Sequence, residues 1–270
     1  MTATNTRLKV ATVCMNAVQD KEANLQTFFR YMEEAAAQGT QLIVFPEVSL
    51  QQNPGWGFLS VHKPTQTELK YLRDTAETVP GKSTDSVVDK ARELGIYVVF
   101  GMTEKESEEG PLYNTSVFVG PDGVIRKYRK NNLWDAENGE GNEHLCWERG
   151  RELVVADSPW GMVGLMICID MAHLLGLQLA VRGADLLVTA SAWPGVAGDN
   201  YEKFTVQNAV EARRWHVVSN QVGPVGYGED YGHSRIVQPN GEIVADTGGQ
   251  EGMVVADIDL YTGRDAVKGR

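Results

Sequence analysis

The chain is organised around the stretch Met162-Val163-Gly164-Leu165-Met166-Ile167-Cys168-Ile169-Asp170. Its apolar run is typical of a buried strand, and it ends on a thiol that is followed two residues later by a carboxylate. Helical spacing comes next, with apolar side chains at Met171, Leu174, Leu175 and Leu179. Arg182-Gly183-Ala184-Asp185 then breaks that helix before a second apolar run, Leu186 to Thr189. The order strand, reactive residue, helix, strand predicts a βαβ unit in an α/β protein.

Cys168 therefore falls at the carboxyl end of a strand, which is where open α/β sheets tend to bind ligands. Helix N-termini offer free N–H groups to anions, and such an environment favours the thiolate form of a cysteine. The thiol is thus a candidate nucleophile. Two simpler interpretations compete with this one. A buried cysteine usually serves as a small core hydrophobe, and Asp170 could merely cap the following helix.

The remaining pattern alternates strands and helices in the same way. Asp20 is a plausible N-cap for the first helix, Gly39 ends it, and a later helix is expected to start near Ser83 or Thr84. The expected strands are Leu8–Met15, Leu42–Phe45, Ile96–Gly101, Tyr113–Val119, Val124–Tyr128, His216–Ser219, Ser234–Val237, Glu242–Ala245 and Met253–Ile258. The expected helices cover about 20–38, 69–79, 83–94 and 201–214, and loops are expected at 49–63, 131–150 and Gly223–Gly232.

Length and composition favour one soluble domain over residues 1–270, with a core from about 8 to 258. Charged residues make up 23% and hydrophobic residues 42% of the chain. The net charge of −11 argues against nucleic acid or an anionic membrane as a partner. Three cysteines without a CxxC pair fit a reducing compartment, and no signal peptide or membrane span is recognisable. We therefore expect a cytoplasmic protein.

Three further polar positions could carry chemistry. Glu47 directly follows the apolar run Leu42–Phe45, Lys130 ends the basic run Arg126–Lys130, and Glu143 lies in the irregular 131–150 connection. Taken singly, each has an ordinary explanation. Glu47 could sit at the solvent rim of the sheet, Lys130 in a solvated basic patch, and Glu143 on an exposed loop.

Taken together and in order, these positions resemble the nitrilase superfamily of carbon–nitrogen hydrolases. The matching stretches run through nearly the whole chain: Leu42-Ile43-Val44-Phe45-Pro46-Glu47, Lys127-Tyr128-Arg129-Lys130, Asn142-Glu143 with Gly150, Gly164-Leu165-Met166-Ile167-Cys168-Ile169-Asp170, Arg182-Gly183-Ala184-Asp185-Leu186-Leu187, Ser191-Ala192-Trp193, Asn220-Gln221, and Gly232-His233-Ser234-Arg235-Ile236. The resemblance implies a four-layer α-β-β-α sandwich with two facing sheets.

The resemblance also implies the roles of the site residues. Cys168 would be the nucleophile, Glu47 the general base, and Lys130 the stabiliser of the tetrahedral intermediate, together with the N–H of Ile169. Glu143 would be the second glutamate, which positions substrate and assists proton transfer. Glu137, Glu140 and Glu148 lie in the same loop and remain alternatives for that second role. No cofactor and no metal are implied.

Departures from the family pattern bear on the substrate. Asn132 stands where histidine is frequent, and Ala172-His173-Leu174-Leu175 replaces a run that often begins with arginine. Without that arginine, a substrate carboxylate lacks a ready clamp. The Cys-Trp-Glu of many nitrilases is absent at the nucleophile, and Cys146-Trp147-Glu148 lies too early in the chain. These features favour a small or neutral amide. Pocket candidates, chosen by their nearness in sequence, are Trp56, Trp134, Met171, His173 and Trp193.

Other functions remain open at this point. A nitrile hydrolase, an N-carbamoyl amide hydrolase or an acyltransferase would use the same thioester. A catalytically silent binding scaffold is the alternative from a different class. A metal site at Cys168 and His173 is rejected, because the spacing is poor for zinc and no second pair exists. Family members commonly associate through the helix after the cysteine, so we expect a homodimer or a larger homo-oligomer.

Overall fold

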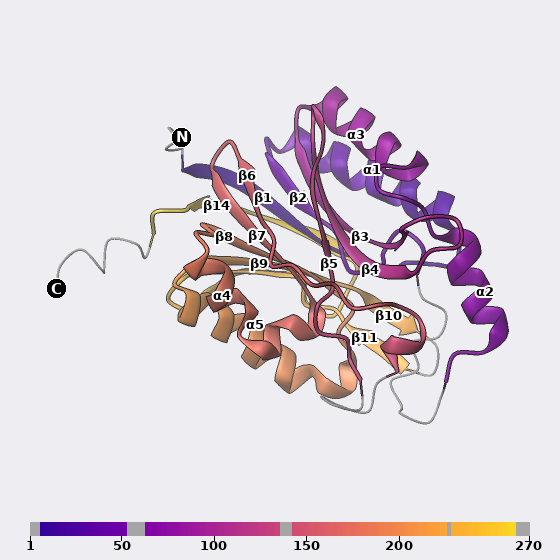
Figure 1. Ribbon diagram of the computed structural model, residues 1–270. Helices are drawn as coiled ribbons and strands as arrows, with labels where there is room; N and C mark the ends of the chain where they lie inside the picture. Colours follow the sequence, from indigo (N-terminus) through magenta and orange to yellow (C-terminus); the bar gives the residue numbers. More distant parts are fainter. Residues whose placement is uncertain (1–5, 53–62, 136–141, 226–227, 263–270) are drawn as a thin grey trace.

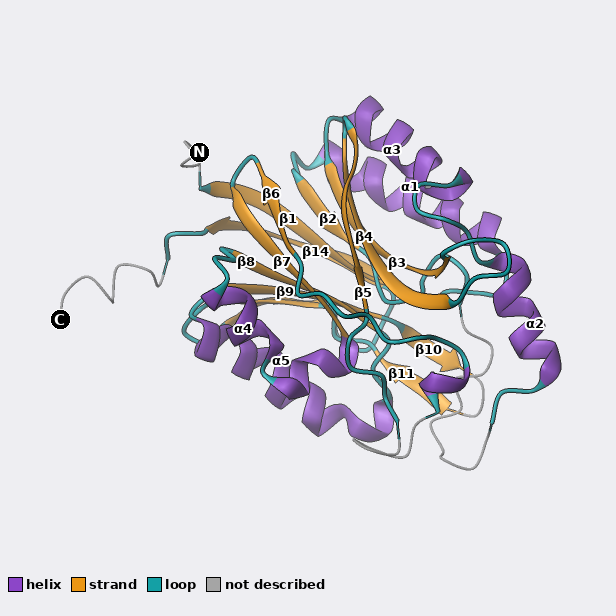
Figure 2. Ribbon diagram, in the orientation of Figure 1, coloured by secondary structure: helices purple, strands orange, loops and turns teal. Residues whose placement is uncertain are grey.

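The computed structural model describes residues 6–52, 63–135, 142–225 and 228–262. Two six-stranded sheets face each other, and helices cover their outer surfaces (Figure 1). Figure 2 shows the resulting order of layers: helices, sheet, sheet, helices. The predicted four-layer α-β-β-α sandwich is therefore confirmed.

The first sheet has the strand order β14-β1-β2-β3-β4-β5. Strands β1, β2 and β3 are parallel, whereas β14, β4 and β5 join by antiparallel pairing. Helices α1 (Lys21–Ala37) and α3 (Lys82–Leu94) cover its outer face, and α2 (Gln66–Thr75) lies at one end (Figure 1). The strands are β1 (Arg7–Cys14), β2 (Leu42–Val44), β3 (Tyr97–Lys105), β4 (Leu112–Gly120), β5 (Gly123–Arg129) and β14 (Gly252–Asp259).

The second sheet has the order β13-β12-β9-β8-β7-β6, and its three central strands β7, β8 and β9 are parallel. Helices α4 (Leu175–Val181) and α5 (Gly198–Ala212) cover it, and β10 (Val222–Val225) pairs with β11 (Gly228–Tyr231) in a separate hairpin. Its strands are β6 (Val155–Ser158), β7 (Gly161–Ile167), β8 (Leu186–Ser191), β9 (Trp215–Asn220), β12 (Arg235–Val237) and β13 (Ile243–Asp246).

Side-chain alternation along the strands explains the layers. In β2 and the residue after it, Leu42 and Val44 join the core between the two sheets, whereas Ile43 and Phe45 join the core beneath α1 and α3. Successive side chains of a strand point to opposite faces. A strand buried on both faces must therefore be apolar throughout, and this is the pattern of the run Leu42–Phe45.

Hydroxyl groups join the two sheets inside this core. Thr12 of β1 donates to the carbonyl oxygen of Val218 in β9 at 2.8 Å. Ser219 and Ser234 both donate to the carbonyl oxygen of Val13, at 2.5 and 2.9 Å. These bonds cross from one sheet to the other, so they fix the position of the sheets as well as their separation.

Several element predictions are confirmed and a few are wrong. The cap of α3 is Gly81, two residues before the predicted Ser83, because the Gly81 N–H and carbonyl both bind the Thr84 hydroxyl. The Gly223–Gly232 stretch is not only a loop, since it forms β10 and β11. Strand β6, at the sheet edge, was not predicted. The helix after Cys168 is interrupted: a 3-10 helix, η2 (Cys168–His173), precedes α4, and Leu174 between them has a φ of 56°.

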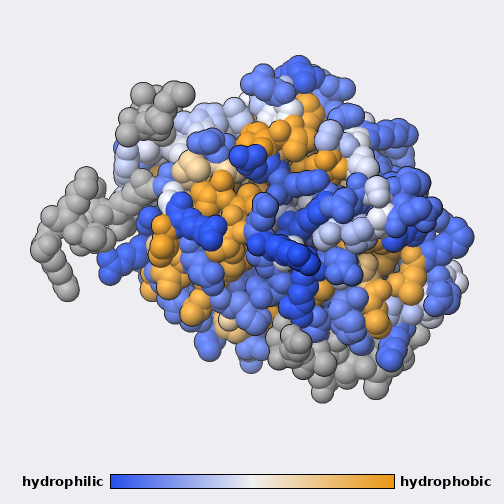
Figure 3. Space-filling view, in the orientation of Figure 1, coloured by the Kyte–Doolittle hydropathy of each residue, from blue (hydrophilic) through white to orange (hydrophobic). Residues whose placement is uncertain are grey.

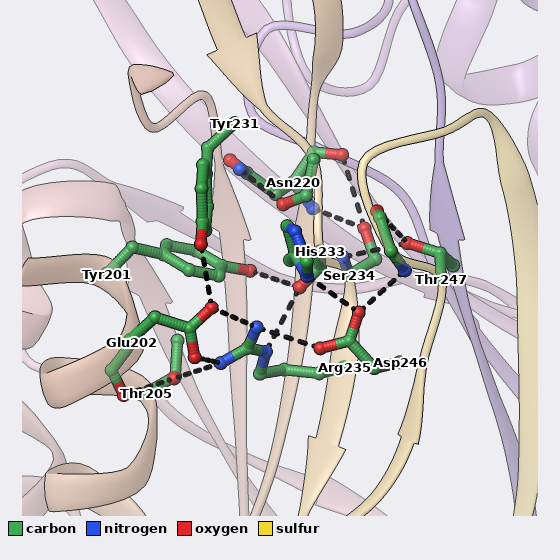
Figure 4. A network of polar contacts seen from close by, with 12 residues as sticks. Tyr201, Glu202, Thr205, Asn220, Tyr231, His233, Ser234, Arg235, Asp246 and Thr247 are labelled. Atoms are coloured by element: carbon green, nitrogen blue, oxygen red, sulfur yellow. Dashed lines mark hydrogen bonds and ion pairs between the residues drawn. The ribbon is translucent and has the colours of Figure 1, made fainter. Parts of the chain in front are cut away.

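A polar network holds the C-terminal strands against α5 (Figure 4). The Arg235 side chain is only 1% exposed and pairs with Glu202 of α5 and with Asp246 of β13, the latter at 2.8 Å. Tyr231 donates to Glu202 at 3.0 Å, and its ring stacks on His233 at 4.5 Å. Because a buried guanidinium needs anionic partners, the Glu202 and Asp246 carboxylates both stabilise the packing of these strands against α5. The network also fixes Tyr231 at the end of the β10–β11 hairpin.

The surface is mostly hydrophilic, with apolar atoms gathered in places (Figure 3). Exposed apolar side chains on and next to α4 are Leu174, Leu177 and Val181. Within the described ranges, no helix combines the length and the apolar character needed to cross a membrane.

Candidate active site

Three charged side chains from separate segments meet in the interior. Lys130 Nζ donates to Glu47 Oε1 and to Glu143 Oε1, each at 2.8 Å. Glu47 and Lys130 are fully buried, and Glu143 is 4% exposed. Glu47 follows β2, Lys130 follows β5, and Glu143 begins the 3-10 helix η1 (Glu143–Leu145). Burial of one cation with two carboxylates is tolerable because each charge has a partner of opposite sign.

Glu47 is held by both halves of the molecule. Asn114 of β4 donates to its Oε1 at 2.7 Å, and the backbone N–H of Ala192, which follows β8, donates to its Oε2 at 2.8 Å. Gly101 of β3 lies against its backbone, and a Cβ added there would lie 2.6 Å from Glu47 Cα. A residue larger than glycine would therefore displace Glu47. The carboxylate is fixed in position and is not at the solvent rim.

Glu143 is the loop acid that the structure brings to Lys130. Its Oε2 accepts from the backbone N–H of Trp134 at 2.8 Å. Burial, opposed by Lys130, raises the pKa of Glu143 to about 7. Of the alternatives, Glu148 is exposed, and Glu137 and Glu140 lie outside the described residues. Burial by itself lowers the pKa of Lys130, but Glu143 and Glu47 raise it well above its usual value, so the ammonium form is firmly held.

Cys168 reaches the same site from the second sheet, at the end of β7. Its side chain is buried, and its φ of 48° lies in the left-handed region, which is uncommon for a residue with a Cβ. Burial raises the pKa of the Cys168 thiol well above its usual value; Glu47 adds to the rise and Lys130 opposes it. The expectation that a helix end favours the thiolate is wrong in this respect: the 3-10 helix η2 does begin at Cys168, but burial and the Glu47 carboxylate outweigh its effect on the thiol. The resting thiol therefore needs a base to take its proton.

Asp170 connects the Cys168 turn to the Lys130 segment. Its Oδ2 accepts from the Tyr128 hydroxyl at 2.7 Å and from the Ile167 N–H at 2.9 Å. Its Oδ1 accepts from Asn132, through the backbone N–H at 3.2 Å and through Nδ2 at 2.8 Å. Tyr128 and Asn132 flank Lys130 on either side in sequence. The carboxylate is thus more than a cap for the next helix: it fastens the two sides of the site to each other.

The predicted oxyanion donor Ile169 and the pocket candidate Trp134 both lie near the cluster. Ile169 is the second residue of η2, where N–H groups lack an acceptor inside the helix. Trp134 adjoins the site through its backbone bond to Glu143.

The other pocket candidates are buried in the core, exposed to solvent, or outside the described residues. Met171 packs in the core between the layers, and the Trp193 indole packs there too and donates to the Ala197 carbonyl at 2.9 Å. His173 is exposed, and Trp56 lies outside the described residues. The role of these side chains in a substrate pocket stays a prediction.

Several groups of this site were missed from the sequence. Asn114 is a polar residue inside an otherwise apolar strand, and that contrast was a usable signal. The Ala192 N–H could not have been found in this way, because an alanine side chain does not indicate a functional backbone group. Among the described residues, no group of three or more His, Cys, Asp or Glu side chains is arranged to hold a metal ion.

Two facing sheets with a buried Glu-Lys-Glu cluster and a strained cysteine define an enzyme of the carbon–nitrogen hydrolase family, and the chain belongs to that family. The family's sequence profile matches residues 9–267. The human protein named Omega-amidase NIT2 is 31% identical over 263 residues, which cover 94% of this chain and 90% of the relative. The protein of the same name from Danio rerio is 30% identical, over 94% of this chain and 89% of its own length.

Solved structures agree in fold. The crystal structure of Saccharomyces cerevisiae Nit3, described as a member of branch 10 of the nitrilase superfamily, superposes with a TM-score of 0.82 at 24% identity, covering 97% of this chain and 94% of its own. An amidase from Nesterenkonia sp. AN1, with the acetamide moiety of fluoroacetamide added covalently at its active-site cysteine, gives a TM-score of 0.76 at 21% identity. That match covers all of this chain and 96% of the amidase.

Proposed function

We propose that this protein is an amidase that hydrolyses a small or neutral carboxamide to a carboxylic acid and ammonia through a thioester on Cys168. The observation that carries the proposal is the buried Lys130, bonded at 2.8 Å to Glu47 and to Glu143, beside a thiol whose pKa is raised by burial and by Glu47. A cluster of this kind supplies a nucleophile, a base and a cation in one dry site. Relatives about 31% identical bear the name omega-amidase, in agreement with this reaction.

In the first half-reaction, Glu47 takes the proton of the Cys168 thiol while the sulfur attacks the amide carbonyl carbon. The carbonyl oxygen becomes an oxyanion, which Lys130 and the Ile169 N–H stabilise; such donors are commonly worth about 3 kcal/mol each. The C–N bond then breaks, and Glu47 returns its proton to the leaving nitrogen. Ammonia departs and the acyl group remains on sulfur as a thioester.

In the second half-reaction, Glu47 takes a proton from a water molecule, whose oxygen attacks the thioester carbon. Lys130 and Ile169 stabilise the second oxyanion, the C–S bond breaks, and the proton returns to sulfur. Glu143 positions the substrate nitrogen and the Lys130 ammonium and assists these proton transfers. The two steps share one base and one oxyanion site, so each side chain works twice in a turnover.

The rest of the expected setting belongs to the same proposal. The chain would act as a single domain, in the cytoplasm, without nucleic acid or membrane partners and without a metal or other cofactor. The exposed apolar side chains Leu174, Leu177 and Val181 on and beside α4 support association into a homodimer or larger assembly, since contiguous apolar patches commonly mark interfaces.

The test is ammonia release from a panel of small aliphatic amides, aromatic amides, nitriles and N-carbamoyl compounds. Release from aliphatic amides by the wild-type protein, abolished in a folded Cys168→Ala variant, is the expected result. Full activity in Cys168→Ala would overturn the mechanism. Cys146→Ala is the matched control, because it removes a partly buried thiol outside the Glu47–Lys130–Glu143 cluster. A folded but inactive Cys146→Ala protein would mean that the nucleophile is the other cysteine.

A further inference from the structure

Asp230 is a buried carboxyl group that the proposed reaction does not use. It lies in β11 and is 7% exposed. The other buried carboxylates of the described chain, at Glu47, Glu104, Asp135, Glu143 and Asp170, accept hydrogen bonds from side chains or backbone N–H groups. Among the described residues, none donates a hydrogen bond or forms an ion pair to the Asp230 side chain. A buried polar group without a partner is costly, so its presence calls for a ligand.

The hairpin geometry points Asp230 toward the catalytic cluster. Asp230 forms a β-bridge with Pro194, and the Tyr231 N–H donates to the Trp193 carbonyl at 2.8 Å. This places β11 directly beside the segment that begins with Ala192, the residue whose N–H binds Glu47.

Side-chain alternation fixes the direction. Tyr231 projects toward Glu202 and the α5 network (Figure 4), and neighbouring side chains in a strand point to opposite faces. Asp230 therefore faces the other way, inward. Glu229 lies on the same face as Tyr231, and its side chain is exposed.

We propose that Asp230 binds an ammonium group at the far end of the amide substrate, so that the enzyme prefers amino-amides over carboxylate-bearing amides. The inference rests on the amidase function proposed above. Within the described part of the chain no cation pairs with Asp230, and Lys130 is engaged with Glu47 and Glu143. A substrate ammonium supplies the missing charge and hydrogen bonds, whereas a substrate carboxylate meets a like charge.

The electrostatics agree with this assignment. Burial raises the pKa of Asp230 well above its usual value, and the Glu47 carboxylate raises it further, which also indicates that the two groups are near each other. An ammonium group beside Asp230 favours its ionised form and so opposes both effects.

The experiment compares pairs of amides that have the same shape but end in an ammonium or a methyl group: β-alaninamide with butyramide, and 4-aminobutyramide with pentanamide. The readout is the ratio of kcat/KM for the amino-amide to that for its methyl partner, measured by ammonia release. We expect a ratio above one in the wild-type protein for at least one pair. In Asp230→Asn the ratio should fall about 10- to 100-fold, since a hydrogen bond to a charged group is lost.

Glu229→Gln is the matched control: it removes the same charge from the exposed face of the same strand, and its ratio should stay at the wild-type value. Asp230→Asn keeps the shape of the side chain and breaks no internal hydrogen bond, so it should fold; if its thermal unfolding shows otherwise, Asp230→Ala takes its place. Turnover of butyramide and pentanamide with a ratio of one or less, or a ratio equal in wild type and Asp230→Asn, overturns the inference and leaves the amidase intact. Ammonia release from no amide overturns the proposed function together with the inference.

Discussion

At the scale of single residues, the site depends on groups that hold catalytic side chains as well as on those side chains themselves. Asp170 is the clearest example. It touches Tyr128 and Asn132 on either side of Lys130, and it also binds the N–H of Ile167, next to Cys168. The position of Asp170 two residues after the thiol therefore has a structural reason: its carboxylate holds the Cys168 turn against the segment that carries Lys130.

Replacing Asp170 with asparagine should lower kcat at least tenfold with little change in KM. An amide offers one acceptor oxygen where the carboxylate offers two, so its NH₂ group must face a donor, and Lys130 and Cys168 lose their fixed relation. We also expect a loss of about 1–3 kcal/mol in the free energy of unfolding, from the buried donors left unpaired. Steady-state kinetics and denaturant unfolding check both, with the exposed Asp157→Asn as control. An unchanged kcat in a destabilised Asp170→Asn protein would assign the residue to the fold alone.

The pH dependence should report Glu143. The carboxylate accepts from Lys130 and Trp134, so the ionised form is the one that organises the site, and its pKa is raised to about 7. An acid with that pKa is protonated below pH 7 and ionised above it. We therefore expect kcat/KM to rise up to tenfold per pH unit below an apparent pKa near 7 and to level off above, as a property of the whole cluster.

The matched variant is Glu143→Gln, which should lose this limb and about 100-fold or more of kcat. A flat profile between pH 5.5 and 8 in wild-type protein that stays folded throughout would contradict the assignment.

At the scale of elements, polar side chains pin strands and helices together within the core. His216 of β9 is fully buried between β8 and α5: its Nδ1 lies 2.9 Å from the Thr205 carbonyl oxygen and its Nε2 lies 2.7 Å from the Thr189 hydroxyl. A carbonyl only accepts, so Nδ1 carries the proton and Nε2 accepts from Thr189. The neutral ring satisfies both neighbours.

This histidine should make the fold sensitive to acid. Burial lowers the pKa of His216 from 6.5 to about 4. Below pH 6.5 the His216 imidazole binds a proton in the unfolded chain but not in the folded one. The free energy of unfolding therefore decreases as the pH falls from 6.5 to 4. The loss amounts to at most roughly 3 kcal/mol in the free energy of unfolding.

Urea unfolding at several pH values checks the expectation. His216→Asn should cost stability at pH 7, but the difference from wild type should shrink toward pH 4. The exposed His173→Asn is the control. A difference that is constant with pH would mean that His216 is not a source of acid sensitivity.

The sequence predicted the elements well where a single physical cause dominates. The apolar runs at β2 and β8 predicted strands buried on both faces, and Asp20 predicted the start of α1, where its side chain accepts from the Ala23 N–H at 3.1 Å. It failed where tertiary contacts decide. Leu174 adopts a left-handed conformation between η2 and α4, and helical spacing of apolar residues cannot reveal that break. The glycines of the β10–β11 hairpin gave a turn signal that concealed two short strands.

The candidate site shows the same division. Strand ends and family motifs led to Glu47, Lys130, Glu143 and Cys168, because each follows a recognisable apolar run or motif. Asp230 was not found, since nothing in Gly228–Tyr231 distinguishes a buried acid from the exposed acid beside it. The pocket candidates were chosen by nearness in sequence alone, and their role in binding substrate stays a prediction.

At the level of the whole molecule, the exposed apolar side chains on and beside α4 favour contact with a second copy of the chain. Leu174, Leu177 and Val181 are 45%, 40% and 81% exposed. The double variant Leu177→Glu, Val181→Glu should shift the protein from dimer to monomer in light scattering coupled to size-exclusion chromatography, since like charges would face each other across a symmetric contact. Val18→Glu, at a residue 44% exposed near α1, is the control. A wild-type protein that is already monomeric, or a double variant that still dimerises, would contradict the proposal.

The position of the site between the sheets has a consequence for when the folding chain becomes active. Glu47 and Lys130 leave the first sheet, whereas Cys168 and the Ala192 N–H leave the second, and Thr12 and Ser219 join the two sheets through the backbone of the opposite one. Neither sheet holds a nucleophile and a base of its own. The pairing of the Cys168 thiol with its base therefore forms only when the two sheets have docked, so turnover reports that the fold is complete.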